Sequence, residues 1–371
     1  MSAAKNDALL TTRFMVLSVL TTIILMAVAV ISVDSFGEAA WEGTRYVGMI
    51  LPGSKDSPGR NRAHYQGLKT ACDRLGYDLL LRDNVSEGVG LAKQAAQELI
   101  NGGAKTIFVI DGVHVADIAE LSEEYPHVRF FAVGLFASNK AKIREYSVRD
   151  YEPQFLAGML AGLRTKTGCV GFVAPYSSPN INRGINAFTL GVKRTNPAAN
   201  VLLTFTGSTN NRIKEEQAVQ VLKAARVDVL SYHQDGSAVA YAAERSSIYF
   251  ISYHELYRDC GRCLGAVTIN WEKAYGNMLK SDKAATDNAR IWQGMVEDAI
   301  DIHLVRGKLT NREFAAIETE RAQLMQGKTI FNGEIFDRSG NKRCEANESI
   351  GSNYIRNSMN WLIQGVTLID N

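Results

Sequence analysis

The feature that most constrains the fold is a regular alternation of short apolar segments with amphipathic segments, which is divided once near the middle of the chain. The apolar segments have the length of β-strands, and the segments between them carry apolar residues at helical spacing. Strands are predicted at 46–51, 77–81, 106–110, 128–133, 169–174, 201–206, 227–231, 249–252 and 266–269. Because the connections are short, this order favours parallel sheets covered by helices on both faces. The predicted fold class is therefore α/β.

The division falls in residues 151–188, which join a small-residue helical pattern to a new strand. The helical pattern at 155–163 ends at Lys166-Thr167-Gly168, and an apolar run and a polar loop follow. We interpret this stretch as the crossover between two lobes, with the working site in the cleft between them.

The predicted lobes use both halves of the chain. Lobe 1 is expected at 44–150, completed by about 272–330, and lobe 2 at 151–271, completed by about 331–371. Trp292, Met295, Ala299 and Ile302 have helical spacing, which predicts a long helix over 287–306.

The N-terminal region contains 20 consecutive residues without a charge, at 14–33. That length is sufficient for a helix to cross a bilayer. Lys5 and Arg13 precede the segment, so residues 1–13 are expected in the cytoplasm and the bulk of the chain outside, after a linker at 34–43. The segment is either an uncut signal anchor in the cell membrane or a signal peptide cleaved near Ala27-Val28-Ala29, which would release a periplasmic or secreted protein.

Composition and motifs exclude several classes of function. The net charge is +2, and no basic run is interleaved with aromatic residues, so no nucleic-acid partner is expected. The sequence has no GxGxxG after the first strand, no GxxxxGK[ST], no HExxH and no GxSxG, so neither an enzyme nor a cofactor is expected. Histidines at metal spacing are also missing, and no metal site is expected. Cys260 and Cys263 form a CxxC that is either a local disulfide or a pair of free thiols.

Ligands of open parallel sheets bind beyond the carboxyl ends of the strands. This rule selects loops rich in hydrogen-bonding and aromatic side chains, which suit a small polar ligand with a flat ring. The selected loops are 53–61, 111–114, 176–182, 233–237, 253–255 and 270–271.

Several ordered motifs are similar to those of the basic membrane protein family. They are YEPQFLAGMLAGLRTKTGCVGFVAP from residue 151, NRGINAFTLGVKRTNPAANV after it, YHQDGSAVAYAAE at 232–244 and INWEKAY at 269–275. The resemblance covers about residues 44–366. It implies a type I periplasmic-binding-protein fold, with two Rossmann-like lobes joined by three crossovers. It also implies extracytoplasmic binding of a purine nucleobase or nucleoside for an ABC importer.

The resemblance also implies a set of ligand-binding residues. Carried over by position, they are Asp56, Arg60, Asn61, Asp111, Tyr176, Asn182, His233, Asp235, Tyr253, His254 and Trp271. Relatives have an aromatic residue where this chain has Arg60, and a second aromatic falls on Thr209. The acidic residue that often holds ribose is replaced around His254.

Each of these side chains also has an ordinary structural interpretation. Asp235 either accepts ligand hydrogen bonds or caps the helix that follows it, and Asp111 has the same two roles open. Trp271 either contacts ligand or fills the core at a crossover. Arg60 begins a helix, where a cation opposes the macrodipole, and this favours a role in binding.

Three classes of function follow. The first is a solute-binding protein that closes on its ligand and is recognised by an ABC permease. The second uses the same fold as a ligand-sensing ectodomain for a membrane kinase or chemoreceptor. The third is a nucleoside-processing α/β enzyme, for which steady product formation from nucleosides would be the evidence.

Overall fold

The computed structural model describes residues 45–57, 59–86, 88–134, 142–281 and 290–370. Two separate sheets dominate them, and neighbouring strands in both are parallel apart from one antiparallel edge strand. The α/β fold with parallel sheets, predicted from the alternation, is therefore confirmed. The predictions for residues 1–13, 14–33 and 34–43 lie outside the described residues. Among the residues described, no helix is both long and apolar enough to span a membrane.

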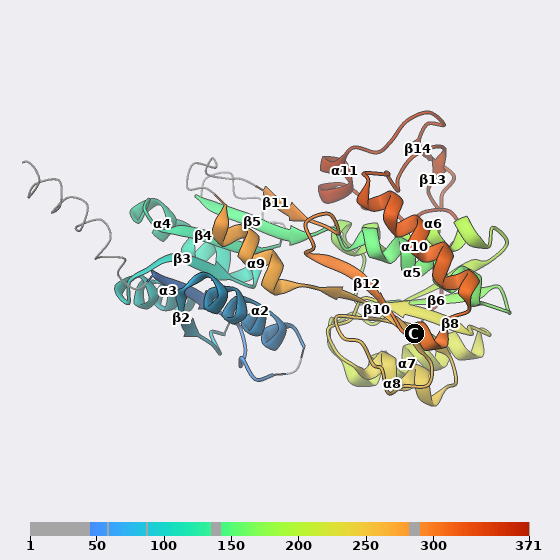
Figure 1. The fold of residues 1–371 in the computed structure, drawn as a ribbon, viewed down its shortest axis with the longest axis horizontal. Coiled ribbons are helices and arrows are strands. Elements are labelled where there is room, and N and C mark those ends of the chain that lie inside the picture. The colour runs from blue at the N-terminus through green and yellow to red at the C-terminus, as the bar shows by residue number, and fades with distance from the viewer. Residues whose placement is uncertain (1–44, 58, 87, 135–141, 282–289, 371) are drawn as a thin grey trace, which may run out of the picture. The chain divides into compact units, whose positions relative to one another are not determined.

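The first sheet has six strands in the order β11-β5-β4-β3-β1-β2. Its strands are β1 (Arg45–Ile50), β2 (Tyr77–Arg82), β3 (Ala104–Val109), β4 (Arg129–Val133), β5 (Ile143–Val148) and β11 (Arg290–Gln293). Its helices are α2 (Arg60–Leu75), α3 (Leu91–Asn101), α4 (Val115–Glu124) and α9 (Trp271–Lys280), with the 3-10 turn η1 (Gly112–His114) before α4. We call this unit lobe 1. Figure 1 shows α2 and α9 side by side on it, and the two helices are in contact.

The second sheet has seven strands in the order β12-β10-β9-β8-β6-β7-β15. Its strands are β6 (Cys169–Ala174), β7 (Asn200–Phe205), β8 (Val229–Tyr232), β9 (Tyr249–Tyr253), β10 (Cys263–Ile269), β12 (Ile300–Leu304) and β15 (Val366–Leu368). Its helices are α5 (Tyr151–Arg164), α6 (Pro179–Thr195), α7 (Arg212–Ala224), α8 (Ala238–Arg245) and α10 (Asn311–Met325). We call this unit lobe 2.

The remaining C-terminal elements are short. They are the 3-10 turn η2 (Arg306–Lys308), the two-stranded hairpin of β13 (Ile335–Phe336) and β14 (Lys342–Cys344), and the helix α11 (Ser352–Asn357). Helix α11 packs on α6.

The chain passes between the sheets three times: after β5 into α5, after β10 into α9, and after β11 into β12. The predicted helix over 287–306 is wrong at the third passage, where β11 and β12 stand instead. Ile300, Ile302 and Leu304 alternate along β12, which pairs antiparallel with β10. A short apolar run satisfies both the helical and the strand period, and the pairing with β10 decides between them.

Helices α5 and α6 approach each other at backbone distance through glycines. A methyl group on Gly158 would lie 1.9 Å from the carbonyl oxygen of Phe188, and one on Gly191 would lie 2.0 Å from that of Phe155. The small-residue pattern of residues 151–188 therefore serves close packing. Most of α5 is buried, with α6 on one side and α10 on another.

Candidate functional site

A cavity of about 610 Å³ is lined by both lobes at the carboxyl ends of their strands. It contains side chains of both charges together with several aromatic rings. Eight of the residues predicted for the site line it: Arg60, Asp111, Tyr176, His233, Asp235, Tyr253, His254 and Trp271. Residues from all six loops that the strand-end rule selects therefore lie around one cavity.

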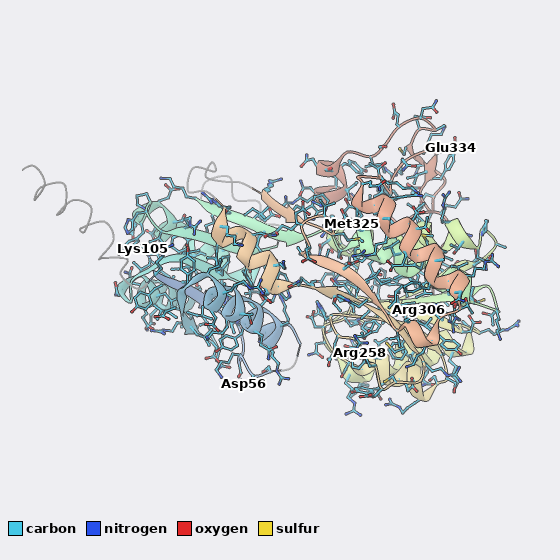
Figure 2. The ribbon with its side chains drawn as sticks, viewed as in Figure 1. Asp56, Lys105, Arg258, Arg306, Met325 and Glu334 are labelled. Atoms are coloured by element: carbon cyan, nitrogen blue, oxygen red, sulfur yellow. The ribbon has the colours of Figure 1, made fainter. Side chains whose placement is uncertain are left out.

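Three predicted residues do not line this cavity. Asp56 lies on the loop that leads into α2 (Figure 2). Its side chain is 78% exposed and pairs with Lys55. Asn61 is half-buried against Gly53. Asn182 is fully buried in α6 and accepts a hydrogen bond from the Ser177 hydroxyl at 3.1 Å.

Asp235 faces His254 across the end of two neighbouring strands. The Asp235 Oδ1 atom lies 3.6 Å from His254 Nε2, and the side chain is 26% exposed. Burial raises the pKa of Asp235, but hydrogen bonding from His254 and the nearby charges of His254 and Arg60 outweigh it and leave the pKa below its ordinary value. The N-cap of α8 is Ser237. Asp235 is therefore a carboxylate acceptor in the cavity wall, rather than the cap residue of that helix.

His254 has a backbone conformation that is unusual for a residue with a side chain. Its φ is 68°, in the left-handed region, and its N–H donates to the Val267 carbonyl at 2.8 Å. Such a conformation costs about 1 to 3 kcal/mol and is found preferentially at functional sites. The turn places the imidazole beside Asp235 and the ring of Tyr253, whose centroid lies 4.1 Å away.

The two lobes meet beside this carboxylate. Gly59, which precedes α2, has a φ of 97°, and a methyl group there would lie 3.0 Å from the backbone oxygen of Asp235. The backbone of Asp235 is itself held by a hydrogen bond from its N–H to the Thr209 carbonyl, at 2.8 Å. A side chain at position 59 would press on the backbone of Asp235, and the positive φ there would strain any residue other than glycine.

Arg60 begins α2 and lies on the lobe 1 wall. Its guanidinium donates to the carbonyl of Ile110, and it lies 3.7 Å from the carboxylate of Asp111. The planar guanidinium is therefore held at the end of β3. Its side chain is 33% exposed, which leaves part of it open to the cavity.

Trp271 belongs to an aromatic cluster behind the cavity. Its ring centroid lies 3.8 Å from that of His64, and the Nδ1 atom of His64 hydrogen-bonds with the Tyr275 hydroxyl at 2.6 Å. The Tyr275 hydroxyl also hydrogen-bonds with that of Tyr146, at 3.0 Å. Burial lowers the pKa of His64, so this ring is neutral and its partners fix its orientation.

The sequence did not indicate three of the charged or titratable residues that line the cavity: His64, Asp150 and Arg183. His64 lies inside α2, beyond the loops that the strand-end rule selects. Asp150 follows β5, a strand that the apolar pattern did not reveal, and it would otherwise have been selected by the strand-end rule. Arg183 lies in the second turn of α6, beyond the loops that the rule selects.

A second cavity, of about 850 Å³, adjoins the first. The two share Asp235, Tyr253 and His254, and the second is otherwise lined by residues of α2, α7 and α8 and of the loops beside them. Asp235 therefore borders both cavities, each of which is larger than a single small ring requires.

Within the described ranges, no group of three or more His, Cys, Asp and Glu side chains is arranged to hold a metal ion. Cys260 and Cys263 are free thiols, as are the other three cysteines. The cavity therefore offers hydrogen-bond acceptors, a guanidinium and aromatic faces, which are the groups that bind a polar planar solute.

Comparison with known proteins agrees with this geometry. The family model described as ABC transporter substrate-binding protein PnrA-like matches residues 44–335. A purine-binding protein of Brucella abortus is 26% identical over 349 residues, which cover 92% of this chain and 98% of that protein. A glucose-binding protein assigned to an ABC transporter of Haloferax volcanii is 25% identical over 208 residues, or 55% of this chain and 53% of that protein.

Solved structures show the same fold. A solute-binding protein of an ABC transporter system from Conexibacter woesei aligns with a TM-score of 0.60 at 17% identity, covering 76% of this chain and 97% of that one. A second, from Aeropyrum pernix, has a TM-score of 0.61 at 15% identity, covering 76% and 92%. The resemblance stated from the sequence motifs is confirmed: the chain belongs to the PnrA-like family of ABC transporter substrate-binding proteins.

Proposed function

We propose that the protein binds a purine nucleobase or nucleoside in the 610 Å³ cavity outside the cytoplasm and presents it to an ABC permease. The family and the purine-binding relative in Brucella abortus support this proposal. It also assigns ligand-binding roles to the eight predicted residues that line the cavity.

The observation that carries the proposal is the presence of a carboxylate and aromatic rings in one cavity. Asp235 supplies an acceptor for ring N–H or amino groups, while Tyr253 and Trp271 supply flat apolar faces. A heteroaromatic base needs both kinds of contact. A sugar alone would use the carboxylate and stack less extensively.

Binding shifts the lobes toward the closed arrangement. The ligand contacts Arg60 and Trp271 on one side and Asp235 and Tyr253 on the other only when the lobes are together. A ligand that contacts both lobes binds the closed state more tightly, and its differential affinity sets the population shift. The permease would then recognise the closed state.

The test is a ligand panel on the purified full-length chain, read by thermal unfolding and calorimetry. Adenine, hypoxanthine, guanine, adenosine and inosine are compared with glucose. At a concentration 100 times the Kd, a ligand that binds only the folded state adds about 2.7 kcal/mol of stability. A response to purines alone supports the proposal. A response to glucose alone, or steady conversion of a nucleoside to products, contradicts it.

We further propose that residues 14–33 remain attached and tether the protein to the cell membrane. The length of the uncharged segment, beyond its small-residue site, supports an uncut anchor. Mass spectrometry of the native N-terminus tests this. A mature chain that starts near Val30 would show cleavage and overturn the tether.

A further inference from the structure

Asp150 lies at the first passage between the lobes, directly before α5, and its carboxylate has two partners. Its side chain is 3% exposed. Arg183 of α6 donates from Nε to Asp150 Oδ1 at 3.1 Å, and His233 of lobe 2 brings Nδ1 to 3.5 Å from Asp150 Oδ2. A buried carboxylate oxygen accepts hydrogen bonds, so the groups that face it must be donors.

The imidazole of His233 is therefore oriented with its Nδ1 toward an acceptor. Its Nδ1 is buried and makes no hydrogen bond, so the Asp150 carboxylate 3.5 Å away is the acceptor nearest to it, while the side chain is 14% exposed and lines the cavity. The ring also stacks on Tyr253, with centroids 4.3 Å apart. Since Nδ1 is buried toward Asp150, we infer that the opposite edge of the ring, which carries Nε2, faces the cavity.

The charge state of His233 determines what Nε2 offers. Burial lowers the pKa of His233 to about 4, against the opposing effect of Asp150, so the ring is neutral at physiological pH. A neutral imidazole has one N–H, and a carboxylate beside one nitrogen places the proton there. With the proton on Nδ1, the Nε2 atom is a bare acceptor.

We propose that Asp150 is a positioning residue, which holds His233 in the Nδ1–H form so that the cavity presents two acceptors, His233 Nε2 and the Asp235 carboxylate. These two acceptors would select a purine with an exocyclic amino group at position 6 over its 6-oxo counterpart. An amino group has two N–H bonds and can donate one to each acceptor. An oxo group is itself an acceptor, so it would face both of them without a hydrogen bond. The selection rests on the purine function proposed above, but the tautomer does not.

The experiment has two readouts on the full-length chain. Long-range ¹H–¹⁵N NMR spectra of histidine-labelled protein identify the tautomer of His233, with assignment by the loss of its signals in His233→Gln. Calorimetry measures the affinities for adenine and hypoxanthine. The wild-type protein is expected in the Nδ1–H form, with adenine bound about 10-fold to 100-fold more tightly than hypoxanthine.

The informative variant is Asp150→Asn. Arg183 would keep its hydrogen bond to the amide oxygen of the new side chain, so the amide NH₂ would face Nδ1 of His233. Facing a donor, Nδ1 would lose its proton and the ring would change to the Nε2–H form. The preference for adenine is then expected to fall to within about threefold of parity or to reverse. The matched control is Asp301→Asn, which removes another part-buried carboxylate paired with arginine, Arg321, outside the cavity. It should change neither the tautomer nor the preference.

The two proposals fail separately. An Nε2–H ring in the wild-type protein overturns the positioning role, and this measurement requires no variant to fold. Equal affinities for adenine and hypoxanthine overturn the selection of an amino group. An Nδ1–H ring that changes in Asp150→Asn supports the positioning role even if no purine binds, and in that case the purine function alone is contradicted.

Discussion

Arg356 of α11 donates a hydrogen bond of 2.6 Å to Glu145 of β5, although 211 positions separate the two residues in the sequence. The Arg356 side chain is 6% exposed and that of Glu145 is 4% exposed. The pair therefore joins the C-terminal helix to the sheet of lobe 1 in a setting with little water. Arg356 also shares Trp292 with Arg183, since both guanidinium groups lie within 6 Å of that ring.

Removal of the arginine should be costly. Arg356→Met is expected to lower the free energy of unfolding by about 3 to 5 kcal/mol, because Glu145 would remain buried without its close partner. Urea unfolding measures the loss. The matched control is Arg212→Met, which breaks the exposed Arg212–Glu216 pair and should cost less than about 1 kcal/mol. Equal losses in the two variants would contradict the structural role of the buried pair.

The contact between α5 and α6 should not accept even a methyl group. Gly191→Ala places a carbon 2.0 Å from the Phe155 carbonyl, so the helices must separate. We expect the free energy of unfolding to fall by about 1 to 3 kcal/mol. Gly276→Ala in α9 is the control, since no heavy atom lies within 4 Å of the new carbon there and alanine favours the helix. A Gly191→Ala variant as stable as Gly276→Ala would refute the close packing.

The neutral state of His233 predicts a pH dependence of stability. Its pKa falls from 6.5 to about 4 on folding, so the unfolded chain binds more protons between these values. Stability should therefore decrease as pH falls from 6.5 to 4, by about 3 kcal/mol for this group. Unfolding measured across this range in wild type and His233→Gln isolates the effect. His64 adds a slope of the same sign, which both proteins share. Identical slopes would show that His233 contributes nothing.

Asp235 and Asp56 should differ sharply in their effect on binding. Asp235→Asn is expected to weaken purine affinity about 10-fold to 100-fold, because it replaces one acceptor oxygen of the cavity wall by a donor. Asp56→Asn should leave affinity unchanged, since that side chain is 78% exposed and lies outside the cavity. Calorimetry with the tightest purine of the panel compares them. If Asp56→Asn weakened binding as much as Asp235→Asn, the ligand would have to bind outside the proposed cavity.

The sequence predicted the α/β architecture because the alternation of strand and helix is a local signal. Residues 151–188 were also correctly singled out, since the glycines and alanines there record the contact between α5 and α6. The ordered motifs were sufficient to identify the family. By contrast, β11 and β12 were not predicted, because their apolar residues also fit a helical spacing and only the pairing with β5 and β10 decides for strands.

For the same reason, the sequence predicted only part of the candidate site. Residues that follow recognised strands, such as Asp235 and Tyr253, were selected by position alone. Asp150 depends on β5, which carries Arg144 and Glu145 among its buried residues and so does not read as apolar. The role of His64 depends on Trp271 and Tyr275, which are about 200 positions away, and no local pattern encodes such a contact.

The order of strands in the sheets has a consequence for biosynthesis. The lobe 1 sheet has β11 at its edge, and the lobe 2 sheet has β12 at one edge and β15 at the other. All three come from residues 290–368, so neither sheet is complete until strands from this late segment have been synthesised. Until then β5, β10 and β7 present unpaired edges, to which chaperones bind and along which chains aggregate. A chain that lacks residues 290–368 would therefore leave both sheets open at an edge.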